Sequence, residues 1–124
     1  KNFVKLWGTG KPIREFLFSN DMAKSCIKIM SLSKHKVNKF IKPQQSQINL
    51  GTGKGISIKE LSSIVASVVG FKGKIIFDDN YPDGHPKKVN DISIQTKLGI
   101  KNKFDLKRGI EKCYRGYLKY NGRL

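Results

Sequence analysis

Apolar positions along the chain change spacing several times, as they do where strands alternate with helices. Four short apolar runs predict extended segments: residues 3–7, 13–18, 47–50 and 74–77. Turn-forming glycines close two of these runs, at Gly8-Thr9-Gly10 and Gly51-Thr52-Gly53. Short strands separated by helices predict an α/β fold, or α+β for the chain by itself, with small strands and about four helices.

Helices are predicted where apolar residues recur every three or four positions. The clearest one begins with Ser57-Ile58-Lys59-Glu60, whose serine and glutamate fit a capping box, and it ends at Gly70. A short helix is predicted over residues 93–98, and a last one begins after Asp105, whose side chain would cap it.

The first helix is predicted to begin at Ser19 or Asn20, either of which would cap it, and to run to about residue 33. Its apolar stripe consists of Met22, Cys26, Ile29, Met30 and Ser33. Residues 34–46, which are polar, basic and contain a proline, are predicted to form a surface loop.

Composition and charge narrow the class of protein. The 124 residues suffice for one domain, and no run is apolar enough for a membrane span or a signal peptide. The net charge of +16 comes from 25 basic against 9 acidic residues. A nucleic-acid-binding domain is one explanation. However, the excess is scattered lysine rather than clustered arginine, which favours a bias of composition over a basic binding surface.

The two cysteines, Cys26 and Cys113, each fall in an apolar helical pattern without a CxxC partner. We expect two buried thiols in a reducing compartment, and therefore a cytoplasmic protein.

No self-sufficient active site is visible in the sequence. The glycine-rich loop at residues 51–55 matches neither the dinucleotide fingerprint nor the P-loop, so we expect an ordinary turn. No tyrosine is followed four residues later by a lysine, the pair that short-chain dehydrogenases use for proton transfer. His35 and His85 are far apart and lack acidic or cysteine neighbours, so no metal site is expected.

Two residues near the N-terminus suit an anionic ligand that carries rings. Trp7 precedes a glycine turn, where an indole stacks on a ring or donates one hydrogen bond. Arg14 lies in an otherwise apolar stretch, so its guanidinium needs an acceptor. A diphosphate would match its forked donors, and the structural alternative is an ion pair with Glu15 or Asp21.

Further candidates lie in the second half of the chain. Lys74 opens a predicted strand, where its ammonium group could contact an anionic ligand or could be an ordinary solvated lysine. The loop at residues 82–88 could set the carboxylate of Asp83 against a ribose and the ammonium of Lys88 against a phosphate, or it could be a polar turn only.

Taken in order, these segments resemble the GDP-L-fucose synthases. The specific motifs are Trp7-Gly8-Thr9-Gly10-Lys11-Pro12-Ile13-Arg14-Glu15-Phe16 and Pro82-Asp83-Gly84-His85-Pro86-Lys87-Lys88. The segments Ile48 to Gly53, Ser57 to Leu61 and Val68 to Asp78 add to them, so the resemblance covers nearly the whole chain.

The resemblance implies the C-terminal substrate-binding part, residues 1–124, of an extended short-chain dehydrogenase. An N-terminal Rossmann domain, absent here, would bind NADP(H) and supply the catalytic residues. Such enzymes convert GDP-4-keto-6-deoxymannose to GDP-L-fucose, work as homodimers, and would use Trp7, Arg14, Lys74, Asp83 and Lys88 as substrate-binding positions. A chain without the catalytic tyrosine and lysine would be inactive alone.

One departure from the family pattern is Phe18-Ser19-Asn20-Asp21, where the family usually has His-Val-Asp-Asp. It leaves open a paralogous epimerase or dehydratase for another nucleotide sugar, or a non-catalytic module that binds nucleotide sugars.

Overall fold

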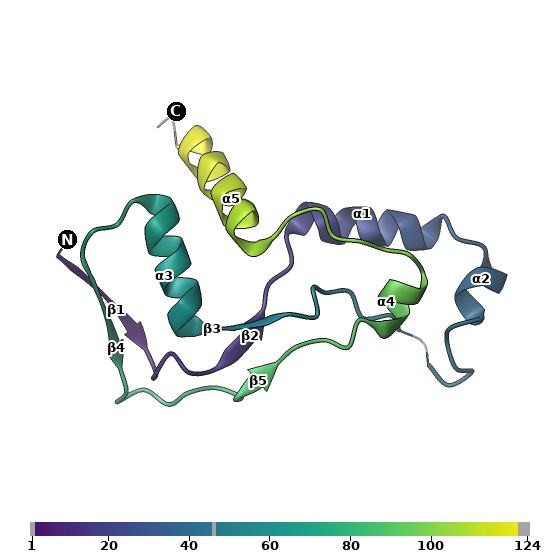
Figure 1. Cartoon of the computed structure of the whole chain (residues 1–124), viewed down its shortest axis with the longest axis horizontal. Helices are drawn as coiled ribbons and strands as arrows, with labels where there is room; N and C mark the ends of the chain where they lie inside the picture. Colours follow the sequence, from purple (N-terminus) through teal and green to yellow (C-terminus); the bar gives the residue numbers. More distant parts are fainter. Residues whose placement is uncertain (1, 46, 122–124) are drawn as a thin grey trace.

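The computed structural model describes residues 2–45 and 47–121. These residues form five helices and two small sheets in an elongated arrangement, with β1 and β4 at one end and α2 at the other (Figure 1). The α/β class is confirmed. The additional helix, α2 (Lys34–Asn38), lies in the stretch predicted as a loop, where the Ser33 side chain caps it by accepting a bond from the Lys36 amide.

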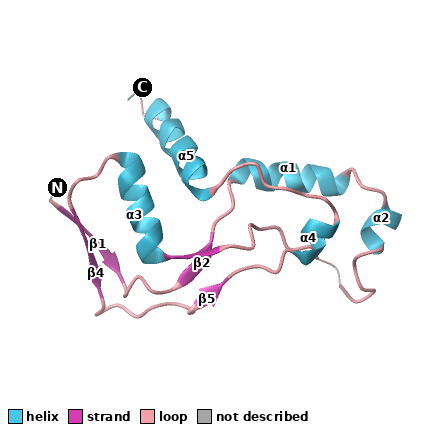
Figure 2. Ribbon diagram, in the orientation of Figure 1, coloured by secondary structure: helices cyan, strands magenta, loops and turns pink. Residues whose placement is uncertain are grey.

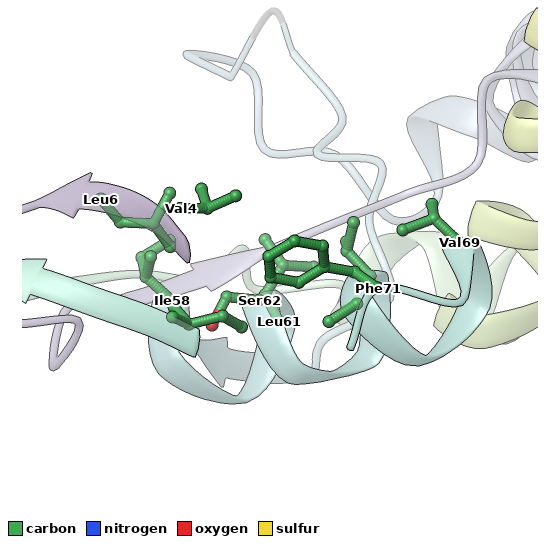
Figure 3. Close-up of a pocket in the computed structure, with 10 residues that line it drawn as sticks. Val4, Leu6, Ile58, Leu61, Ser62, Val69 and Phe71 are labelled. Atoms are coloured by element: carbon green, nitrogen blue, oxygen red, sulfur yellow. The ribbon is translucent and has the colours of Figure 1, made fainter. Parts of the chain in front are cut away.

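Two segments predicted to be extended, β1 (Phe3–Trp7) and β4 (Lys74–Asp78), are strands. They pair in a parallel two-stranded sheet. Phe3 is paired with Lys74 and Trp7 with Asp78. Because side chains alternate along a strand, one face carries Val4, Leu6 and Ile75 toward α3 (Ile58–Val69), with an apolar hollow between strand and helix (Figure 3). The opposite face carries Phe3, Lys5, Trp7, Lys74, Ile76 and Asp78.

Helix α3 has the predicted ends. The Ser57 hydroxyl accepts from the Glu60 amide at 3.1 Å, and the Glu60 carboxylate accepts from the Ser57 amide at 3.0 Å. Gly70 ends the helix with φ 72°, in the left-handed region that glycine enters without strain. Helix α5 (Leu106–Tyr120) packs against α3, and Asp105 caps it by accepting from the Arg108 amide at 2.9 Å.

A second sheet has β2 (Ile13–Glu15) at its centre, antiparallel to β3 (Gly55–Ser57) and parallel to β5 (Lys87–Lys88). The strand predicted at residues 47–50 is wrong, and residues 16–18 of the predicted second strand are not extended in a sheet either. Side chains take the place of a neighbouring strand at Gly51. Its amide donates to Gln95 Oε1 at 2.8 Å, and its carbonyl accepts from Gln95 Nε2 and Asn102 Nδ2.

Helix α1 (Ser19–Met30) faces the interior with polar residues. Asp21 and Ser25 are 3% and 4% exposed, whereas Ile27 and Met30 are 67% and 84% exposed. The cause is the Asp21 carboxylate, which accepts from two backbone amides, those of residues 103 and 104, at 3.0 and 2.9 Å. The helix begins after Phe18 with no side-chain cap, so the capping predicted for Ser19 or Asn20 is wrong.

The outward rotation of α1 also corrects the predicted burial of the cysteines. Cys26 lies on the outward side of α1, and Cys113 of α5 is exposed too; both are free thiols. Among the described residues, the buried apolar side chains are Leu98 and Ile100, next to α4 (Ser93–Lys97). Long loops carry the chain between β4 and β5 and between α4 and α5 (Figure 2). The chain therefore leaves much apolar surface uncovered.

Candidate functional site

Two of the predicted ligand residues are neighbours in the second sheet. Arg14 of β2 and Lys88 of β5 are register partners in a parallel pair, which places their Cα atoms about 4.8 Å apart and their side chains on the same face. Both residues line an open hollow at the end of these strands. The hollow is completed by Glu15, Leu17, Met22, Leu50, Gly51, Val89 and Asn90.

The Arg14 guanidinium has donors to spare. Its Nη1 atom donates to the carbonyl of Ile13 at 2.7 Å. Within residues 2–45 and 47–121, the ion pairs are Lys5 with Asp78 and Arg108 with Asp105, so Arg14 has no carboxylate partner there. The structural alternative, an ion pair with Glu15 or Asp21, is therefore not the arrangement that the fold adopts. Two cations side by side suit an anion with several oxygens, such as a diphosphate.

Glu15 binds backbone amides instead of Arg14. One carboxylate oxygen accepts from the amides of Thr52 and Gly53, the latter at 2.6 Å, and the other accepts from the amide of Asn90 at 2.7 Å. Burial raises the pKa of this carboxyl. The hydrogen bonds from the backbone amides of Asn90, Gly53 and Thr52 lower it by more, so the pKa lies below its ordinary value.

Glu15 was not among the candidate site residues predicted from the sequence. The available signal was an acidic residue directly after Arg14 in an apolar run, with a glycine-rich loop elsewhere to supply amides.

The same bonds explain why the glycine-rich loop is not a phosphate cradle. Its amides at Thr52 and Gly53 point at the Glu15 carboxylate, and a Cβ atom at Gly51 would overlap that carboxylate. The chain therefore shows no fit to the pyrophosphate of a dinucleotide at this loop, in agreement with the ordinary turn expected from the sequence.

Trp7 and Asp83 lie at a second cluster, formed by the loops that follow β1 and β4. The Trp7 ring, 72% exposed, stacks on Tyr81 with centroids 4.6 Å apart and planes at 14°. Asp83 accepts from the amide of Thr9 at 2.8 Å and from its hydroxyl. The hydroxyl and then the amide of Thr9 lower the pKa of Asp83 most, so its carboxylate holds the glycine turn in place.

The loop that carries Asp83 also reaches the first cluster. Gly84 follows Asp83, and a Cβ atom there would stand 3.2 Å from Arg14 Nη2. The structure thus brings four of the predicted residues, Trp7, Asp83, Arg14 and Lys88, along one connected run of loops and strands.

Lys74 lies apart from this run. It shares the open face of the β1–β4 ladder with Trp7 but sits at the opposite end, opposite Phe3. Four residues of strand rise separate the two levels, about 13 Å. An extended ligand that reaches from Trp7 along this face would be needed to contact both.

Among the described residues, no group of three or more His, Cys, Asp or Glu side chains is arranged to hold a metal ion. No described helix has the length and apolar character required to cross a membrane.

Comparison with known proteins finds clear relatives of this chain. No protein-family model matches it. The GDP-L-fucose synthase of Escherichia coli K12 is 38% identical over 120 residues, which cover 97% of this chain and 37% of that enzyme. The chain spans about a third of the length of the curated relatives it matches.

Solved structures agree in fold and in sequence. The GDP-6-OMe-4-keto-L-xylo-heptose reductase of Campylobacter jejuni is 38% identical with a TM-score of 0.84, covering 97% of this chain and 35% of that one. A GDP-D-glycero-L-gluco-heptose synthase from the same organism, solved in the presence of NADPH, is 37% identical with a TM-score of 0.81 and covers 94% and 33%. By sequence and by fold, the chain is similar to about one third of the length of the GDP-L-fucose synthases and of related GDP-sugar enzymes.

Proposed function

We propose that this chain is the substrate-binding part of a GDP-sugar epimerase and reductase of the GDP-L-fucose synthase kind. The whole enzyme would epimerise GDP-4-keto-6-deoxymannose and reduce it with NADPH to GDP-L-fucose. The observation that carries the proposal is the pairing of Arg14 with Lys88 on one sheet face without a carboxylate partner among the described residues.

The other predicted residues extend this anion site in both directions. Trp7, stacked on Tyr81, offers an exposed aromatic surface to a base or a sugar ring. Asp83 holds the glycine turn beside Trp7. Its carboxylate already accepts hydrogen bonds from the amide and hydroxyl of Thr9, so a ribose would bind to the same carboxylate in addition to them. Lys74 would contact the far end of the ligand along the open β1–β4 face.

Cofactor binding and catalysis are assigned to the remainder of the enzyme. The amides of the glycine-rich loop are occupied by Glu15, and no tyrosine of this sequence has a lysine four residues later. We therefore place NADP(H) and the catalytic residues on a preceding Rossmann domain and expect residues 1–124 alone to leave NADPH unoxidised. We further propose a homodimer for the whole enzyme and a cytoplasmic location, which suits two free, exposed thiols.

The outward face of α1 is the surface that we propose for docking that domain. Met22, Cys26, Ile27 and Met30 form an exposed apolar stripe, while the polar side of the helix points inward. About two thirds of the length of each relative lies outside the part that matches this sequence. An exposed apolar stripe of this kind marks a protein–protein contact. We propose that the remainder of the enzyme, which the relatives have, covers it.

A second candidate substrate class is favoured by the structural relatives. Both heptose enzymes are as similar to this chain as the E. coli fucose synthase. A paralogue that modifies a GDP-heptose would use the same diphosphate site and differ at the sugar end.

Titration calorimetry on residues 1–124 tests the proposal. GDP and GDP-L-fucose should bind, and a random single-stranded oligonucleotide should bind more weakly and lose affinity steeply with salt. Arg14→Ala should cost roughly 1.5–3 kcal/mol of GDP affinity, whereas Arg115→Ala, an exposed control on α5, should cost little. Binding of the oligonucleotide without binding of GDP or GDP-L-fucose would refute the proposal. Tighter binding of a GDP-heptose than of GDP-L-fucose would favour the second substrate class.

A further inference from the structure

Glu15 joins three segments that are far apart in the sequence. It belongs to β2, and its carboxylate binds the amides of Thr52 and Gly53 through one oxygen and the amide of Asn90 through the other. The Thr52 hydroxyl adds a fourth bond at 3.2 Å. These partners lie 37, 38 and 75 residues away along the chain.

The geometry links this carboxylate to the anion site. Glu15 and its partner Asn90 line the same open hollow as Arg14 and Lys88. Asn90 follows Lys88 by two residues, just after β5. Strand β5 has only two residues, so few ladder bonds hold it against β2. The bond from the Asn90 amide to Glu15 fastens the chain directly after Lys88 to the strand that carries Arg14.

We propose that Glu15 is a positioning residue for the GDP-sugar, whose carboxylate keeps Lys88 beside Arg14 at the spacing that a diphosphate needs. The inference rests on the proposed function. Glu15 lines the same hollow as Arg14 and Lys88, but its carboxylate oxygens are occupied by backbone amides, so it acts on the ligand through Lys88 and Arg14.

Both oxygens of the carboxylate must act as hydrogen-bond acceptors. A carboxylate offers only acceptors, and the groups that bond to it from Thr52, Gly53 and Asn90 are all donors. In Glu15→Gln the side chain keeps its shape, but its NH₂ group faces either the Asn90 amide or the amides of Thr52 and Gly53. One of the two attachments is therefore lost, since two donors cannot bond to each other.

A double-mutant cycle separates positioning from general stability. GDP is titrated into wild type, Glu15→Gln, Lys88→Ala and the double variant, each checked by circular dichroism for native helix content. Glu15→Gln should weaken GDP binding at least about fivefold, and this loss should disappear when Lys88 is already alanine. The same cycle with Lys74→Ala, which lies on the other sheet, should be additive.

Two results would overturn the inference while leaving the proposed function in place. One is an unchanged GDP affinity in Glu15→Gln, and the other is an equal loss in the Lys88→Ala background, which would mark a general structural role. If wild type binds no GDP, the proposed function fails, and the inference fails with it. Should Glu15→Gln not fold, Glu15→Asp keeps the charge but is too short to reach both attachments, and the same cycle with Lys88→Ala is measured on it, with the same results counting against the inference.

Discussion

Removing the Asp21 carboxylate should destabilise the chain substantially, although Asp21 lies on a helix with an exposed apolar face. Asp21→Ala leaves the two amides at residues 103 and 104 without the acceptor that stands 3.0 and 2.9 Å away. At about 1–1.5 kcal/mol for each bond, the free energy of unfolding should fall by about 2–3 kcal/mol. That is a large fraction of the total for a domain, about 5–15 kcal/mol.

Urea unfolding followed by circular dichroism measures this loss, which corresponds to a midpoint lower by about 1–2 M. Asp21→Asn is the matched control. Both amides bond to one carboxylate oxygen, and the asparagine retains one oxygen for that position, so it should lose less than half as much. Lys24→Ala, an exposed change on the same helix, should stay within about 0.5 kcal/mol. A midpoint for Asp21→Ala within about 0.3 M of wild type, far less than the expected shift, would refute this account of why α1 points its polar side inward.

Three further outcomes are expected. Ser57→Ala removes one half of the α3 capping box and should cost about 1 kcal/mol in thermal unfolding, whereas Ser67→Ala on the same helix should cost little; equal effects would contradict the capping role. Glu15, whose pKa in the folded chain lies below the ordinary 4.5, adds stability that is present above that pH and is lost as the pH falls through its folded pKa. Wild type should therefore lose more stability than Glu15→Gln between pH 5.5 and 3.5, and parallel losses would exclude this contribution. Residues 1–124 should self-associate through the stripe on α1, and Ile27→Lys with Met30→Lys should reduce the mass measured by light scattering; a monomer before substitution would contradict this.

The elements that depend on neighbouring residues could be predicted from the sequence. The capping box at Ser57 and Glu60, the left-handed Gly70 and the cap at Asp105 involve groups within a few residues of one another. Their geometry is fixed by local spacing, so the sequence alone was sufficient for α3 and for the start of α5.

The orientation of α1 could not be predicted in this way. Its periodicity suggested an apolar face turned inward, but the polar side is held by amides 82 and 83 residues away from Asp21. The strand predicted before Gly51 failed for a similar reason. Distant side chains bond the backbone at its end: Asn90 bonds the Leu50 carbonyl, and Gln95 and Asn102 bond Gly51. Bonds between distant segments decided both cases.

The candidate site was predictable residue by residue but not as an arrangement. Resemblance supplied Arg14 and Lys88, yet their pairing depends on β5, a two-residue strand inside a stretch that the sequence indicated only as a loop. Glu15 was considered only as a partner of Arg14. Its attachment to Asn90 appears only when residues 75 positions apart are brought together.

The exposed thiol of Cys26 makes the stripe on α1 a surface that can be followed chemically. With Cys113 replaced by serine, a maleimide or a disulfide reagent would label Cys26 alone, and its rate of alkylation would measure how open the helix face is. Labelling should be fast on residues 1–124 at dilutions where they are monomeric, and slow wherever another protein surface, a second copy included, covers the stripe. Cys26 is therefore a natural reporter of whether this face of α1 is covered.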